Sequence, residues 1–134
     1  MSQKVLLATS KGSDRQLAQH AFEAYDVRLI DTTNGIQALD MFIEHGNDAV
    51  FSILGAGLPV RNGLDLVRIL KKSSRFSHIP ILLVVDSKKS EAYEKASKSW
   101  SEEVAGRPLD QDDLKRAFES LRLEQPLSAI QNSS

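Results

Sequence analysis

Five short apolar segments recur along the chain, and connections long enough to hold a helix separate most of them. The segments are residues 5–8, 27–32, 49–54, 79–85 and 104–106. Connections of this length do not close β-hairpins, so the strands are expected to run parallel with helices on both faces of the sheet. The alternation therefore predicts an α/β fold, a doubly wound five-stranded parallel sheet flanked by five helices.

The composition of the strands predicts their order in the sheet. Residues 79–85 are apolar throughout, which is typical of a central strand covered on both faces. Residues 27–32 alternate and residues 104–106 form a short segment, as edge strands do. The flavodoxin-like order 2-1-3-4-5 places these two segments at the edges.

Amphipathic spacing predicts the helices and the core. The first helix is expected to begin at Ser13, with Gln16 completing a capping box, and Asp110 is expected to cap the last helix. Residues 88–99 predict a weaker helix. The expected inward positions are Leu17, Ala18, Ala21 and Phe22; Ile36, Leu39, Phe42 and Ile43; Leu66, Val67 and Leu70; and Leu114, Ala117, Phe118 and Leu121. The expected inner sheet is Leu6, Leu7, Val50, Ile53, Leu82 and Leu83.

Composition limits the classes of function. The 134 residues suit one domain, over residues 1–124, followed by a polar tail or linker over 125–134. The net charge of −1 shows no basic surplus, so nucleic acid is not an expected partner. No apolar run approaches the roughly 20 residues that span a bilayer, and the N-terminal apolar stretch is too short for a signal peptide. With no cysteine for disulfides, we expect a soluble cytoplasmic protein.

The stretch "FSILGAGLP", residues 51–59, raises the question of function. Ligands of doubly wound sheets bind beyond the carboxyl ends of the strands. At the end of this strand, residues 54–58 contain no acid, base, nucleophile or metal ligand. The loop in which reactive or ligand-binding side chains are expected therefore contains none.

Four stretches resemble one family in spacing and order: "NGIQAL" (34–39), "PVRNGLDLVRIL" (59–70), "HIPILLVV" (78–85) and "GRPLDQDDL" (106–114). Through them, residues 4–124 resemble the receiver domains of bacterial response regulators. The resemblance implies aspartyl phosphorylation. It implies an acidic pair that holds Mg²⁺, an acceptor Asp after the third strand, a Thr or Ser after the fourth, and a Lys before a proline after the fifth.

The sequence departs from the family at each of these positions. The acidic pair falls on Thr9 and Ser10, the hydroxyl on Val85, and the Lys on Arg107. The acceptor falls on Gly55 when counted back from Pro59, and on Ile53 when counted forward from Asp48, which suggests a two-residue insertion in this loop.

These substitutions remove the groups that phosphorylation needs. Mg²⁺ binds through carboxylates, and the hydroxyls of Thr9 and Ser10 carry no charge. A phosphoryl acceptor must be a nucleophile, which neither Ile53 nor Gly55 offers. We therefore expect a pseudo-receiver: a phosphorylation-independent interaction module that is not an enzyme and that uses no cofactor and no metal.

Two other functions stay open. A flavodoxin-like protein would bind a flavin or another anion in the same crevice, through the loops at residues 10–12 and 55–57. An atypical receiver would be phosphorylated at a displaced acid, Asp86, whose simpler role is to cap the following helix. Arg107 would either bind an anion or pair with Glu102 or Glu103 at the surface.

The resemblance implies a partner surface made of the fourth helix, the fifth strand and the fifth helix. The expected contact residues are Tyr93, Lys95, Trp100, Val104 and Arg107. Trp100 either packs locally or serves as a binding hot spot. The expected partner is a protein of a bacterial signalling pathway or a second copy of the chain.

Overall fold

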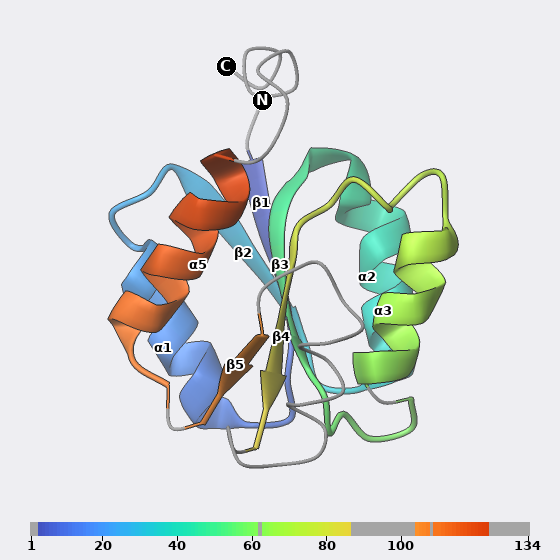
Figure 1. The fold of residues 1–134 in the computed structure, drawn as a ribbon, viewed down its shortest axis with the longest axis horizontal. Helices are drawn as coiled ribbons and strands as arrows, with labels where there is room; N and C mark the ends of the chain where they lie inside the picture. Colours follow the sequence, from blue (N-terminus) through green and yellow to red (C-terminus); the bar gives the residue numbers. More distant parts are fainter. Residues whose placement is uncertain (1–2, 62, 87–103, 108, 124–134) are drawn as a thin grey trace.

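The computed structural model describes residues 3–61, 63–86, 104–107 and 109–123. Its sheet contains β1 (Gln3–Ala8), β2 (Val27–Thr32), β3 (Ala49–Gly55), β4 (Ile81–Val85) and β5 (Val104–Gly106). Every pairing is parallel, and the order is β2-β1-β3-β4-β5, with β2 and β5 at the edges (Figure 1). The predicted fold class and strand order are confirmed.

Helices cover both faces of this sheet (Figure 1). The described residues contain α1 (Gly12–Phe22), α2 (Gly35–His45), α3 (Gly63–Lys72) and α5 (Gln111–Leu123), and a 3-10 turn (Gly46–Asp48). The helix predicted at 88–99 and the tail at 125–134 lie outside the described residues. Within the described part of the chain, no helix is both long and apolar enough to cross a membrane.

The core forms two layers, one on each face of the sheet. On one face, α2 and α3 contribute Phe42, Leu66 and Leu70 over Leu6 and Leu83. On the other face, α1 and α5 contribute Phe22, Ala18 and Phe118 over Leu7 and Leu82. The predicted burial is confirmed for Leu6, Leu7, Ile53, Leu82 and Leu83, and for the covering residues Phe22, Phe42, Leu66 and Phe118.

Val50 is the exception in the predicted inner sheet, because it is only half-buried. The register between β1 and β3 shifts here: Lys4 pairs with Ala49, and the next residue, Val5, pairs with Phe51. Val50 is therefore the extra residue of a β-bulge, and it packs at the margin of the same cluster that buries Phe51. A bulge breaks the strict alternation on which the prediction depended.

The inward face of α2 was also predicted partly wrongly. Ile36 and Ile43 are both 54% exposed. The buried positions are instead Ala38, Met41 and Phe42. At 3.6 residues per turn, Ala38, Met41 and Phe42 share one side of the helix and Ile36 and Ile43 share the other, so burying the first set leaves both isoleucines outward.

The capping predictions have opposite outcomes. At α5, the Asp113 N–H donates to Asp110 Oδ1 (2.8 Å) and the Asp110 N–H donates to Asp113 Oδ2 (3.0 Å), so the predicted cap is confirmed. At α1, the predicted Ser13 cap is wrong, since the helix begins at Gly12 with Lys11 as its N-cap. The Lys11 N–H donates to Thr9 Oγ1 (3.1 Å), which turns the chain into the helix before Ser13.

Leu82→Ala is expected to lower the free energy of unfolding by about 2–5 kcal/mol, because it opens a cavity in the layer between the sheet and the helices α1 and α5. Ile43→Ala, on an exposed α2 position, is expected to lower it by no more than about 0.5 kcal/mol. Urea denaturation of both variants measures the difference. Equal losses would contradict the assignment of β4 to the core.

Candidate functional site

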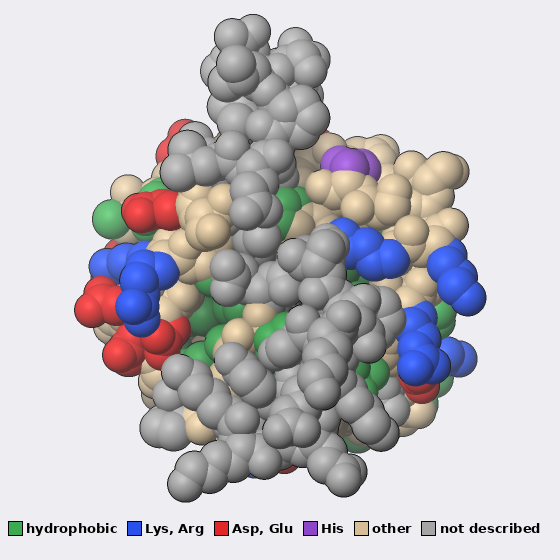
Figure 2. Space-filling model, in the orientation of Figure 1, with side chains coloured by type: hydrophobic (Ala, Val, Ile, Leu, Met, Phe, Trp, Pro, Cys, Tyr) green, Lys and Arg blue, Asp and Glu red, His purple; other side chains and the backbone are tan. Residues whose placement is uncertain are grey.

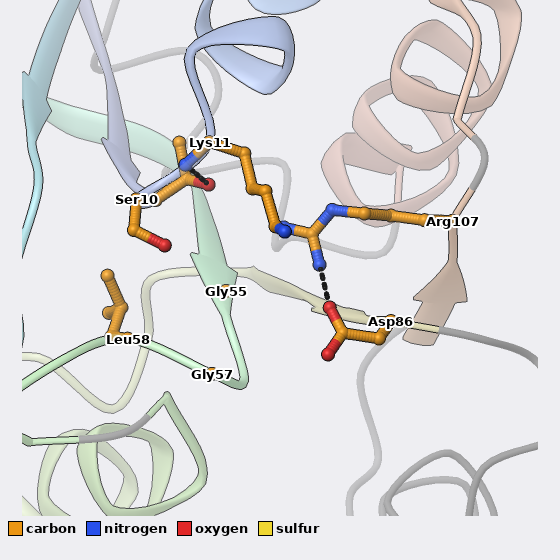
Figure 3. A pocket seen from close by; sticks show the side chains of 8 residues that line it. Ser10, Lys11, Gly55, Gly57, Leu58, Asp86 and Arg107 are labelled. Atoms are coloured by element: carbon orange, nitrogen blue, oxygen red, sulfur yellow. Dashed lines mark hydrogen bonds and ion pairs between the residues drawn. The ribbon is translucent and has the colours of Figure 1, made fainter.

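A small pocket lies at the carboxyl edge of the sheet. Because the strands are parallel, their carboxyl ends meet there. Backbone hydrogen bonds continue past the strand ends, from Ala56 N to Val84 O (2.8 Å) and from Arg107 N to Val85 O (2.9 Å). The pocket has a volume of about 130 Å³ and is lined by Thr9, Ser10, Lys11, Gly55, Gly57, Leu58, Asp86 and Arg107 (Figure 3).

Close backbone contacts hold the loop between β3 and α3 beside this pocket. A Cβ at Gly63 would lie 2.3 Å from the carbonyl oxygen of Gly55, so no larger residue fits without a shift. The Gly63 N–H also donates to Ala56 O (3.1 Å). The loop therefore returns tightly onto the end of β3, and buried Leu58 forms one wall of the pocket.

The strongest charge interaction of the pocket joins Arg107 to Asp14. Arg107 follows β5, and its guanidinium donates to Asp14 Oδ2 (2.5 Å) and, through Nε, to Asp14 Oδ1 (3.4 Å). Asp14 lies in the first turn of α1. The Asp14 and Arg107 side chains are only 8% and 18% exposed, so this pair is largely removed from solvent. Two contacts of one guanidinium with one carboxylate also fix the orientation of both groups.

Thr9 completes the environment of Asp14. The Thr9 hydroxyl donates to Asp14 Oδ2 (2.7 Å) and accepts from the Lys11 N–H (3.1 Å). Thr9 is 3% exposed. Its hydroxyl is therefore committed to holding the carboxylate and the start of α1.

Asp86 provides a second carboxylate for the same guanidinium. Asp86 Oδ1 accepts from Arg107 at 2.8 Å, and Figure 3 shows the two side chains meeting. The Asp86 side chain is 77% exposed. Arg107 thus lies between two carboxylates, one buried and one at the mouth of the pocket; Glu102 and Glu103, its predicted surface partners, lie outside the described residues.

The positions predicted for the phosphorylation site lie in different surroundings. Thr9, Ser10, Gly55 and Arg107 line the pocket, while Ile53 and Val85 are buried among the strands. A Cβ built on Gly55 would lie 3.7 Å from Thr9 Oγ1 and 3.8 Å from the Arg107 guanidinium. A side chain at position 55 would therefore face the pocket, which a side chain at position 53 does not.

The two counts for the acceptor position, to Gly55 and to Ile53, differ by two residues, and the structure explains this difference in part. The bulge at Val50 adds one residue at the amino end of β3. A count forward from Asp48 passes through this extra residue, whereas a count back from Pro59 does not. The forward count therefore includes one residue that has no partner on β1, and this residue lies at the start of the strand and not in the loop.

Asp14 is a site residue that was not predicted from the sequence, although a signal for it was present. Asp14 precedes Ala18 by four residues and Ala21 by seven, which places it on the buried face of α1. An acid at an inward position indicates a buried cationic partner. The prediction of Ser13 as the N-cap obscured the inward position of Asp14, because the first turn of the helix was then expected to be exposed.

The described residues of the pocket do not fit Mg²⁺. Such an ion needs carboxylate oxygens. Here Asp14 and Asp86 both pair with Arg107, and Thr9 and Ser10 offer only uncharged hydroxyls. In the described ranges, no group of three or more His, Cys, Asp or Glu side chains is placed to hold a metal. Of the predicted partner residues, Val104 is half-buried on β5, and Tyr93, Lys95 and Trp100 lie outside the described residues.

The fold and pocket define a doubly wound α/β protein with its site at the carboxyl edge of the sheet. No family model matches the chain. The polar-differentiation response regulator DivK of Brucella anthropi is 30% identical over 84 residues, which cover 63% of this chain and 67% of that protein. DivK of Brucella ovis is 29% identical over the same length.

Solved structures share the same fold. A response regulator receiver domain protein from Clostridium thermocellum matches with a TM-score of 0.78 at 19% identity, covering 90% of this chain and 94% of that one. The receiver domain of a Pseudomonas aeruginosa sensor histidine kinase, with magnesium in its active-site cleft, matches with a TM-score of 0.79 at 15% identity, covering 92% and 100%. The chain belongs to the response-regulator receiver family, whose members act in two-component signalling.

Asp14→Asn is expected to lower the free energy of unfolding by about 2–4 kcal/mol, because it leaves the largely buried Arg107 short of its main counter-charge. Asp86→Asn removes a carboxylate from the same guanidinium at an exposed site, where about 0–1 kcal/mol is expected. Chemical denaturation of both variants gives the comparison. Similar small losses would show that the Asp14 pair does not support the fold.

Proposed function

We propose that this receiver-family chain is a phosphorylation-independent interaction module and not an enzyme. The observation that carries the proposal is the Asp14–Arg107 pair. Arg107 stands where the family resemblance implies the conserved Lys, and its charge is already matched by carboxylates of the chain itself. At the end of β3, Gly55 has no side chain to accept a phosphoryl group.

The internal ion pairs would also oppose an incoming phosphoryl group. Such a group carries negative charge into a site where Asp14 and Asp86 are already present. It would have to displace at least one carboxylate from Arg107 to gain the same contacts. Among the described residues, Lys11 is the other cation that lines the pocket, and no group of metal-binding side chains is placed to offset that repulsion. The proposed state of the pocket is thus constant, and it does not depend on phosphorylation or on Mg²⁺.

The flavodoxin-like alternative receives little support. Ligand pockets typically have volumes of about 300–1,000 Å³. The pocket here has about 130 Å³, which is small for a flavin. Arg107, the predicted anion ligand, already pairs with two carboxylates.

The displaced-acceptor alternative has one observation in its favour. Asp86 is exposed and lines the pocket beside Arg107, at the end of β4. An accessible carboxylate near a guanidinium is a nucleophile that a phosphodonor can reach. This alternative therefore shares an experiment with the leading proposal.

The wild-type chain is expected to stay unmodified when it is incubated with acetyl phosphate and Mg²⁺, because no carboxylate occupies position 55. Intact-mass measurement detects the added phosphoryl group. Beryllofluoride with Mg²⁺ is likewise expected to leave the amide NMR shifts of residues 9–10, 53–57 and 85–86 nearly unchanged.

A mass increase, or large saturable shifts at these residues, would contradict the proposal. If the increase disappeared in Asp86→Asn, the displaced acceptor would be identified instead. Asp48→Asn, on the opposite edge of the sheet, is the matched control and should behave like wild type in both measurements.

The proposed partner surface keeps the fourth helix–fifth strand–fifth helix location, with Tyr93, Lys95, Trp100 and Val104. Arg107 leaves this set, because its guanidinium is held in the pocket by Asp14 and Asp86. The proposed binding partner at this surface is a signalling protein or a second copy of the chain.

Trp100→Ala is expected to weaken self-association by about 2 kcal/mol, or roughly 30-fold in the dissociation constant, if Trp100 is a hot spot of the contact between two copies. Sedimentation equilibrium measures the constant, and circular dichroism checks the fold. An unfolded variant would assign Trp100 to the core. A wild-type chain that stays monomeric at millimolar concentration would remove the second copy as occupant.

A further inference from the structure

Large exposed apolar side chains gather over α2 and α3, the two helices that cover one face of the sheet. Within the described residues they are Ile36 and Ile43 (each 54% exposed) on α2, Ile69 (39%) on α3, and Val60 (74%) on the loop before α3. Exposed apolar side chains that lie together mark interaction sites more often than scattered ones do. The solvent-facing side of these two helices is called the α2–α3 face here.

The two helices carry opposite charges of equal size. Helix α2 has two acidic side chains and no Lys or Arg, a charge of −2 with histidine neutral. Helix α3 has three cationic side chains and one acidic one, a charge of +2. Figure 2 shows Lys and Arg side chains on the right-hand side, where Figure 1 draws α3. The charged residues are Asp40 and Glu44 on α2, and Asp65, Arg68, Lys71 and Lys72 on α3.

Four of these charges are left without an ionic partner inside the chain, apart from one contact with a neighbouring histidine. In the described ranges, Asp40, Arg68 and Lys72 form no ion pair. Glu44 reaches only His45 (3.4 Å), and the Glu44 side chain is 77% exposed. Two acids on one helix and two cations on the next are therefore available for contacts outside the chain.

Two other cations near the face are already engaged. The Lys71 ammonium donates to the carbonyl oxygen of Ser77 (3.1 Å). The Arg75 guanidinium, beyond α3, donates to the carbonyl oxygen of Ile43 (3.0 Å). Arg61, before α3, adds one exposed cation at the end of the face. The unengaged charges on the helices themselves are thus one acidic pair and one basic pair.

The acidic pair and the basic pair occupy equivalent positions on their helices. Asp40 and Glu44 lie five and nine positions after the first residue of α2. Arg68 and Lys72 lie five and nine positions after the first residue of α3. Each pair therefore spans about 6 Å along its helix. Both helices start near the carboxyl end of one strand and return to the start of the next parallel strand, so the two pairs lie at similar levels (Figure 1).

We propose that the α2–α3 face binds a second copy of this chain in a two-fold symmetric dimer. A two-fold axis parallel to the helices sets α2 of one copy against α3 of the other without changing their levels. Asp40 then faces Arg68 of the partner subunit, and Glu44 faces Lys72 of the partner subunit. Symmetry repeats both pairs, and the exposed isoleucines beside them are removed from water.

The proposal rests on the interaction-module function and specifies one partner of that module. It assigns the second copy to the α2–α3 face and leaves the fourth helix–fifth strand–fifth helix surface to the signalling protein. The two contacts use different elements, so a dimer of this kind keeps the other surface accessible.

A second copy suits this face better than a partner of a single charge. An acidic partner would pair with Arg68 and Lys72 but meet Asp40 and Glu44 as like charges, and a basic partner would meet the reverse. The partner must instead present both signs side by side with the same 6 Å spacing, which is about one helical turn. A second copy presents this arrangement by symmetry.

Charge reversal tests the proposal, with sedimentation equilibrium of the full chain up to about 1 mM, without phosphodonor or Mg²⁺. Wild type should dimerise weakly, and more weakly as the salt concentration rises. Asp40→Lys/Glu44→Lys and Arg68→Glu/Lys72→Glu should each raise the dissociation constant at least roughly tenfold, because like charges then face each other. An equimolar mixture of the two variants should associate as wild type does. So should the quadruple variant, in which the two helices exchange signs.

Glu23→Lys/Asp26→Lys is the matched control, because it changes the net charge equally at exposed positions beside α1, on the opposite face of the sheet. It should dimerise as wild type does and should not associate with Arg68→Glu/Lys72→Glu. Ile36→Ser should raise the dissociation constant several-fold, through lost apolar burial. Circular dichroism checks each fold, and an unfolded variant could not restore association in the mixture.

A wild-type chain that stays monomeric at about 1 mM would overturn the proposal. So would a mixture that fails to associate, or a control variant that associates with Arg68→Glu/Lys72→Glu, which would show attraction of net charge only. If Trp100→Ala abolished the dimer and the α2 and α3 variants did not, the second copy would belong to the other surface. None of these outcomes involves a phosphodonor, so the acetyl phosphate test decides the proposed function separately.

Discussion

The guanidinium of Arg107 lies between the carboxylates of Asp14 and Asp86 and so joins α1 to the ends of β4 and β5. The three residues come from distant parts of the chain, and only parallel strand pairing brings them to one edge. The buried half of the arrangement, with Thr9 donating to Asp14, leaves each polar group satisfied. Removing Asp14 would leave a poorly solvated charge on Arg107, so the buried half of the arrangement depends on this pair.

The residues that hold the fold together are largely different from the residues that line the pocket. The two hydrophobic layers are built from residues on both sides of the sheet, and Leu58 is the one residue that belongs to a layer and also lines the pocket. The carboxyl edge can therefore exchange its side chains while the sheet order stays the same. Here a carboxylate from α1 meets the cation after β5, and the strand end at Gly55 contributes backbone only. This edge is the basis of the proposal that the protein binds partners without being phosphorylated.

Hydrophobic patterning predicted the elements well because strands and helices bury one face at a fixed period. It was less successful where a local irregularity changed that period. The bulge at Val50 placed two consecutive side chains on one side of the sheet. On α2, the side with Ala38, Met41 and Phe42 is buried and the side with Ile36 and Ile43 is exposed, and the spacing of apolar residues alone does not distinguish these two sides.

The sequence by itself determined the fold class, the strand order and the residues that occupy the family's site positions. Each follows from local information: segment length, apolar period and the identity of the residue at a given spacing. Only the tertiary structure decided which partners those residues meet. Asp14 and Arg107 are 93 positions apart, and no local pattern specifies their contact. It exists because the parallel sheet brings the start of α1 and the end of β5 to the same edge, where burial makes a paired charge necessary.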